Sequence, residues 1–187
     1  MPDIYIIALI SFVASILGTI AGFGTSTVMM PILVILLPLP IALFFVSIIH
    51  WFNGLIRVFM FRSGINWKLL LSFGLSGILT SIIGAHLAFN LDEALMKRVL
   101  GVVLTFYSIY LILNPKFKLE FNIKNSSLGG LLSGFMAGIF GVGGSIRGAF
   151  LAAFNLPKEV YLANSAFILL AIDSARLSHL FLGRSQG

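Results

Sequence analysis

AGFGTSTVMMP, at residues 21–31, places a cluster of small residues in the middle of a long apolar segment. A related cluster, AGIFGVGGSIRG, occupies residues 137–148 of a second apolar segment. Glycine adopts backbone conformations that other residues avoid, so a helix that enters such a cluster is able to stop, turn and begin again. In a bilayer an unwound backbone survives only where protein packs around it or where it lines a cavity. Two such breaks in matching positions therefore predict a binding site.

The composition identifies the class of protein. Of the 187 residues, 59% are hydrophobic and 10% are charged, and the mean hydropathy is +1.08, which is far from the balance of a soluble domain. We therefore predict an integral membrane protein that sits in a lipid bilayer. Its net charge of +6 comes mostly from Lys and Arg between the apolar segments, where they suit lipid headgroups. Nucleic acid is not expected as a partner, and the absence of cysteine excludes thiolate metal sites and disulfides.

The apolar segments predict an all-α fold, a polytopic helical membrane protein with about six spans. Residues 1–115 form a first repeat of about four spans with its broken segment at residues 22–27, and residues 90–98 are expected to be a short polar loop within it. Residues 116–127 form a longer polar loop. Residues 128–187 form a second repeat of about two spans with its broken segment at residues 141–145. Each of the two related halves thus opens with a glycine-broken helix.

The relation between the halves is visible when the sequence is shifted by 117 residues without gaps. The shift aligns Phe23-Gly24 with Phe140-Gly141, and Leu39-Pro40 with Leu156-Pro157. These identities fall at the break and at the following turn, where a chance match between apolar segments would not be expected to concentrate them. By the same shift the chain ends opposite Leu70, which predicts a truncated second half. The missing helices would be supplied by a second copy in a homo-oligomer or by a partner, unless the chain is a fragment.

The two breaks contain most of the candidate binding residues. A helix that begins inside the membrane presents unpaired N–H groups and the positive end of its dipole, both of which favour an anion. Hydroxyl groups next to the breaks add hydrogen-bond donors. The alternative is that the glycines only allow close helix packing. The predicted substrate-binding residues are Gly22, Gly24, Thr25, Ser26, Thr27, Gly141, Gly143, Gly144, Ser145, Arg147 and Asp173.

Arg147 lies a few residues beyond the second break, within an apolar run. A charge at that depth costs at least about 2.5–3.5 kcal/mol, so it should face the interior and find a partner, for which Asp173 is the expected mate. The alternative is a buried ion pair that only fixes helix packing. For Arg57 and Arg176 we favour packing or snorkelling towards an interface, and we expect His50, like the other two histidines, to bond a neighbouring helix.

Catalytic motifs are absent from the sequence. Neither glycine cluster completes G-x-G-x-x-G, and the chain contains no H-E-x-x-H helix and no G-x-S-x-G elbow. Nothing selects a Ser145 and His179 dyad. We therefore predict no enzymatic activity, no catalytic residue, no metal and no cofactor.

The paired motifs AGFGTST and AGIFGVGGS, one opening each half, resemble the duplicated signature of the TauE/SafE family of sulfite exporters. The resemblance covers essentially the whole chain, with Thr25-Ser26-Thr27 replacing a more usual glycine run and Arg147-Gly148 replacing apolar residues. It implies a secondary transporter that moves a small inorganic or organic anion, such as sulfite or a sulfonate, across the inner membrane of a prokaryotic cell. The alternative is a non-transporting membrane subunit or fragment whose breaks serve helix packing.

Overall fold

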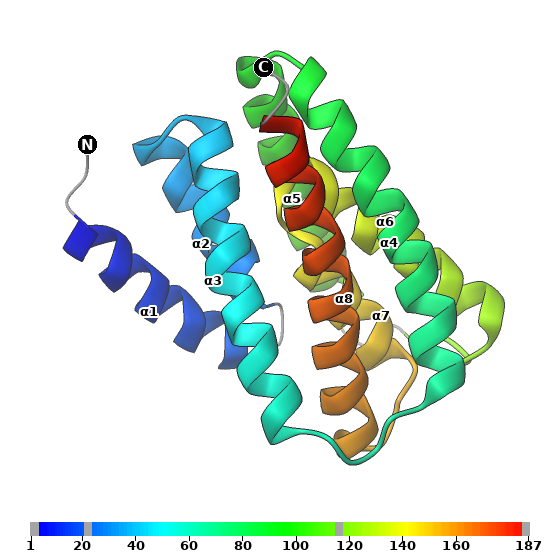
Figure 1. Cartoon of the computed structure of the whole chain (residues 1–187). Coiled ribbons are helices and arrows are strands. Elements are labelled where there is room, and N and C mark those ends of the chain that lie inside the picture. The colour runs from blue at the N-terminus through cyan, green and yellow to red at the C-terminus, as the bar shows by residue number, and fades with distance from the viewer. Residues whose placement is uncertain (1–3, 21–23, 115–117, 185–187) are drawn as a thin grey trace.

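A computed structural model describes residues 4–20, 24–114 and 118–184 (Figure 1). The described residues contain helices and no strand, which confirms the predicted all-α class. The helices, in chain order, are α1 (Ile4–Ile20), α2 (Thr25–Leu36), α3 (Leu39–Met60), α4 (Trp67–Asn90), α5 (Glu93–Leu113), α6 (Ile123–Phe140), α7 (Gly143–Ala153) and α8 (Lys158–Arg184).

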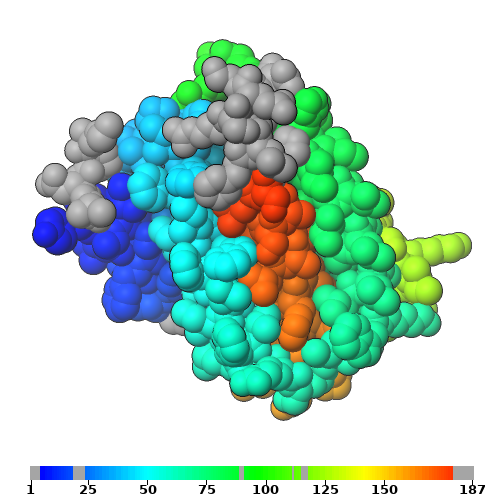
Figure 2. Space-filling view, viewed as in Figure 1, coloured from blue at the N-terminus to red at the C-terminus, as the bar shows by residue number. Residues whose placement is uncertain are grey.

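Three segments of the described chain are long and apolar enough to cross a bilayer, namely Leu39–Met60, Trp67–Ala88 and Lys158–Ser178. Many large apolar side chains on the outer surface are exposed, among them Phe52 and Phe59 of α3 and Leu75 and Leu79 of α4. In water such a surface would be unfavourable, whereas in a bilayer it meets lipid tails. The chain is therefore a multi-pass membrane protein. Figure 2 shows α8 lying between α3 and α4 on one face of the molecule.

The interface between α4 and α6 is built on small residues. A Cβ added to Gly134 would lie 2.0 Å from the Gly77 carbonyl oxygen, and one added to Gly138 would lie 2.3 Å from that of Ser81. The two backbones therefore touch, as they do where small residues recur every four positions in membrane helices. Thr80 strengthens the contact by donating its hydroxyl to the Leu131 carbonyl, at 2.9 Å. This packing holds α6, and with it the second break, in a fixed position.

We expect Gly134→Ala to lower the free energy of unfolding by about 1–3 kcal/mol, because the added methyl group forces two touching backbones apart. Gly74→Ala is the matched control on α4, since nothing lies within 4 Å of its added Cβ. Alanine also has the higher helix propensity, so this control should unfold at the same temperature as the wild type or above it. Thermal unfolding in detergent checks both. Equal losses in the two variants would show that the contact does not limit stability.

The first break separates α1 from α2. Residues 21–23, which include the predicted Gly22, lie outside the described residues. Gly24 has φ 82° and ψ 151°, a region open essentially to glycine alone, and its N–H donates to the Gly18 carbonyl at 3.1 Å. α2 then begins at Thr25 and has 12 residues, so it rises roughly 18 Å, about half of the hydrocarbon thickness.

The second break separates α6 from α7. Gly141 ends α6 in the left-handed conformation, with φ 73°, and its N–H donates to the Ala137 carbonyl at 3.0 Å. α7 begins at Gly143 and has 11 residues, so it too spans only about half the membrane. Ser133 of α6 donates its hydroxyl to the Gly143 carbonyl at 2.8 Å, which ties the start of α7 to the preceding helix.

Two polar segments are shorter than the sequence predicts. The expected loop at residues 90–98 is wrong, because α5 begins at Glu93, with Asp92 accepting the Leu95 N–H at 2.9 Å as an N-cap. α6 likewise begins at Ile123, inside the expected loop at 116–127, because Asn122 caps it by accepting the Asn125 N–H at 2.8 Å. Polar residues that suggest loops in the sequence are thus the caps and first turns of helices.

Glu93 connects the start of α5 to the start of α3. It pairs with Lys97 at 2.8 Å and accepts the Leu39 N–H at 3.1 Å. The hydrogen bond with Lys97, followed by that from Leu39, lowers the pKa of Glu93 from its ordinary value. The contribution of these contacts to stability is therefore present above the unfolded pKa and is lost only as the pH falls through the lower folded pKa, so it does not change near neutral pH.

The buried apolar side chains form two separate cores. The first core joins α2 and α3 with parts of α1, α5 and the end of α6, and includes Met30 and Val46. The second core joins α4, α7 and α8 with Ala137 of α6, and includes Phe73, Leu151 and Ile172. The two cores meet at the end of α6, beside the second break.

Candidate functional site

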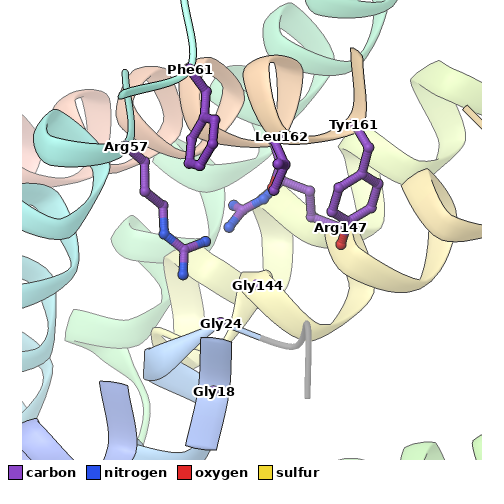
Figure 3. A pocket seen from close by; sticks show the side chains of 9 residues that line it. Gly18, Gly24, Arg57, Phe61, Gly144, Arg147, Tyr161 and Leu162 are labelled. Atoms are coloured by element: carbon purple, nitrogen blue, oxygen red, sulfur yellow. The ribbon is translucent and has the colours of Figure 1, made fainter. Parts of the chain in front are cut away.

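A cavity of about 140 Å³ lies where the two breaks approach each other (Figure 3). A Cβ added to Gly24 would stand 3.5 Å from the Cα of Gly144, so the backbones of the two breaks are neighbours. Helices α1, α3, α7 and α8 complete the walls. The residues that line the cavity are Gly18, Gly24, Arg57, Phe61, Gly144, Arg147, Tyr161, Leu162 and Ser165.

Two guanidinium groups point into this cavity from different helices. Figure 3 shows Arg57 of α3 and Arg147 of α7 directed into the same space. Arg147 is buried, with 4% of its surface exposed, and its Nε has no hydrogen-bond partner. Within the described residues, no carboxylate lies within 4.0 Å of this guanidinium. Two positive charges that share a poorly solvated space repel each other, and an anion between them would relieve that repulsion.

The backbone adds to the positive character of the cavity. Gly24 immediately precedes the first turn of α2, and Gly144 belongs to the first turn of α7. Both half-helices therefore begin at the cavity wall, where their unpaired N–H groups and the positive ends of their dipoles favour negative charge. The cavity thus combines two guanidinium groups with two helix N-termini.

Of the predicted binding residues, Gly24, Gly144 and Arg147 line the cavity. The hydroxyl-bearing residues lie beside it in the breaks. Thr25 and Ser26 are buried and Thr27 is half-buried, and the Ser26 hydroxyl has no hydrogen-bond partner. The Ser145 hydroxyl donates back to the Val142 carbonyl at 3.1 Å. Gly141 and Gly143 are buried in the second break, where they shape the backbone.

A layer of buried polar side chains lies next to the cavity and joins α3 to α8. We call Ser47, His50, Asp173 and Arg176 the polar layer. His50 Nδ1 lies 2.6 Å from Asp173 Oδ2, and Arg176 Nη2 lies 3.8 Å from Asp173 Oδ1. Asp173 is thus paired with His50 and Arg176, and not with Arg147 as the sequence predicts. The reason is that α3 packs directly against α8 and brings His50 opposite Asp173, while Arg176 lies one turn further along α8.

Arg176 connects three helices. It donates from Nη1 to the Ala137 carbonyl of α6 and from Nη2 to the Ser47 hydroxyl of α3, and it is 1% exposed. Its Nη1 would stand 3.3 Å from a Cβ on Gly141. Arg176 therefore holds the carbonyl end of α6 at the second break, so it does not snorkel towards an interface.

The structure places Arg57 in the cavity wall and His50 beside Gly24, although neither stands out as a binding residue in the sequence. A signal for them exists in α3, where Ser47, His50, Gly54 and Arg57 follow one another at intervals of three, four and three residues. These intervals place all of them on one helix face, which packs against α8. Gly54 confirms the close approach, because its added Cβ would stand 2.4 Å from a side-chain carbon of Leu169.

No group of three His, Asp or Glu side chains among the described residues is placed to hold a metal ion. The cavity is instead suited to a negatively charged ligand that two guanidinium groups could bind.

Comparison with known proteins assigns the chain to a family. Residues 7–186 match the family described as sulfite exporter TauE/SafE. A protein of Methanocaldococcus jannaschii named "Probable membrane transporter protein" is 26% identical over 155 residues, which is 75% of this chain and 58% of that protein. The chain thus spans less than two thirds of the length of this relative, and no solved structure matches it. Since the family match covers nearly the whole sequence, the protein belongs to the TauE/SafE sulfite exporter family.

Proposed function

We propose that this chain acts as a secondary transporter, and not as an enzyme, for a small anion that contains sulfur, such as sulfite or a sulfonate. Its place would be the cell (inner) membrane. The observation that carries the proposal is the convergence of Arg57 and Arg147 on a cavity whose wall includes both glycine breaks. Membership of the TauE/SafE family agrees with transport and suggests sulfite as the first anion to test.

The size of the cavity supports a small substrate. Pockets for drug-sized ligands have volumes of roughly 300–1,000 Å³, whereas this cavity has about 140 Å³. An anion with only a few non-hydrogen atoms suits that space, and a nucleotide or a long-chain lipid does not. Phe61 and Leu162 give the wall an apolar part that would accommodate the short carbon chain of a sulfonate.

The charged groups support an oxyanion. Guanidinium presents a planar fork of N–H donors that matches the spacing of oxygen atoms on sulfite, sulfate or a sulfonate. Arg57 and Arg147 would bind different oxygens of one anion because they approach it from different helices. The helix N-termini at Gly24 and Gly144 would add backbone donors.

The same arrangement supports a mechanism of alternating access. Half-helices that meet at the middle of a membrane are the usual place where transporter substrates bind, and one part of the protein then rocks against the other about that site. Here the cavity lies beside the second break, close to where the two apolar cores meet, and relative motion of the cores would open it first to one side and then to the other.

Flux into sealed vesicles tests the proposal. The full chain is reconstituted, and uptake and efflux of labelled sulfite, sulfate and methanesulfonate are measured against empty vesicles. We expect saturable flux of at least one of these anions. No flux from protein that remains folded in the vesicles would contradict transport and favour the alternative, a non-transporting membrane subunit.

A further inference from the structure

His50 and Asp173 form a buried acid–base pair beside the cavity. Their side chains are 2.6 Å apart, and the two residues are 4% and 3% exposed. His50 Nε2, the other ring nitrogen, has no hydrogen-bond partner. A Cβ on Gly24 would stand 3.6 Å from this nitrogen, and Gly24 lines the cavity. One end of the imidazole thus contacts the carboxylate, and the other faces the cavity wall.

We propose that this pair is a proton-binding site coupled to the anion, so that one proton and one anion cross the membrane together in the same direction. This inference rests on the transport function proposed above and names its coupling ion. When the imidazole is neutral, Nδ1–H donates to Asp173 and the lone pair of Nε2 is free to accept a proton. Binding of a proton forms an N–H bond at Nε2 and changes no other bond. The imidazolium is held by the carboxylate and adds a positive charge next to the cavity.

The surrounding charges couple the proton to the anion. The groups that act electrostatically on His50 are Asp173 and Arg176 from α8 and Arg147 from α7. On α3, Ser47 contributes a hydroxyl and Arg57 lies two turns away at the cavity. The positive charges of the arginines repel a proton at His50. An anion bound between Arg57 and Arg147 would reduce this repulsion. By thermodynamic linkage, the proton strengthens binding of the anion to the same extent.

A purely structural role for His50 makes a different prediction. If the pair only ties α3 to α8, a side chain that hydrogen bonds without titrating should replace His50 without changing the response to pH. Glutamine has that property, since its amide donates to a carboxylate but takes up no proton near neutral pH. Glu93 does not complicate the measurement, because its pKa is lowered from its ordinary value and its carboxylate stays charged near neutral pH.

The experiment uses the full chain in sealed vesicles that contain a pH-sensitive dye. Labelled methanesulfonate or sulfate is added outside, since neither anion takes up a proton near neutral pH and any acidification then depends on the protein. For the wild type we expect anion entry with internal acidification, and an apparent affinity that rises by up to about tenfold per pH unit as the pH falls. His50→Gln should retain anion exchange at a reduced rate, with a flat pH profile and no accompanying proton.

His86→Gln is the matched control, since His86 is exposed on α4. Its pH profile and its internal acidification should match those of the wild type. Wild-type flux without acidification, flux with alkalinisation, or an unchanged pH profile in His50→Gln would overturn the coupling and leave the proposed transport intact. Absence of all anion flux from folded wild-type protein would overturn both proposals.

Discussion

We expect Arg147→Met to lower anion flux about 5–75-fold at substrate concentrations near the wild-type KM without destabilising the protein. A hydrogen bond to a charged group contributes about 1.5–3 kcal/mol, so loss of this guanidinium weakens anion binding by about 10–150-fold. Its Nε has no partner and the residue is 4% exposed. Replacing such a charge by an apolar side chain of similar length removes a desolvation cost, so the unfolding temperature should stay the same or rise.

Flux in vesicles and thermal unfolding in detergent are measured on the same preparations. Arg62→Met is the control, because Arg62 is an exposed arginine just beyond α3, and both its flux and its unfolding temperature should match the wild type. Arg147→Lys keeps the charge but loses the planar fork and should give an intermediate affinity. An Arg147→Met protein that unfolds earlier and yet binds the anion normally would mean that Arg147 serves packing.

Arg176→Met should have the opposite effect, namely a loss of about 3–5 kcal/mol in the free energy of unfolding. Arg176 bonds the Ala137 carbonyl and the Ser47 hydroxyl and lies 3.8 Å from Asp173. Its removal leaves the buried Asp173 carboxylate with His50 as its partner and the Ala137 carbonyl with the Gly141 N–H, and a buried charge that loses its counter-charge is costly. The amount of folded protein should fall, whereas the KM of the protein that remains folded should change little.

Thermal unfolding of Arg176→Met beside Arg147→Met checks this contrast. Arg176→Lys keeps a charge near Asp173 and should recover part of the stability, because one ammonium group does not reach all the partners that the guanidinium fork contacts. Equal unfolding temperatures for Arg176→Met and the wild type would show that these bonds add no net stability.

The sequence predicts that both segments are interrupted because the cause is local, but the interruptions are shorter than the predicted 22–27 and 141–145, since α2 begins at Thr25 and α7 at Gly143. Glycine at positions 24 and 141 is required by positive φ angles, and such a requirement is visible in the residue type itself. The sequence does not show whether the polar segments are loops or helix starts, because Asp92 and Asn122 suit a loop and a helix cap equally well. Only the contacts of the following turn decide between the two.

The sequence predicts only some of the residues that line the cavity, for a different physical reason. Arg147 stands out because a charge in an apolar run is costly wherever it lies. Arg57 and His50 do not stand out individually, since their roles depend on which helix α3 packs against. The pairing of Asp173 with His50 likewise depends on the contact between α3 and α8, which the sequence of a single helix does not contain. The face formed by Ser47, His50, Gly54 and Arg57 is the pattern to look for in similar chains.

The two apolar cores and the polar layer between them have a mechanical consequence. Within each core, interlocking side chains resist displacement, whereas the boundary between α3 and α8 combines the close packing of Gly54 on Leu169 with directional bonds among Ser47, His50, Asp173 and Arg176. We expect polar contacts at this boundary to rearrange before either core does, so strain from a thicker or thinner bilayer should act beside the cavity. Lipid composition should accordingly act on this protein through the cavity more than through the stability of either core.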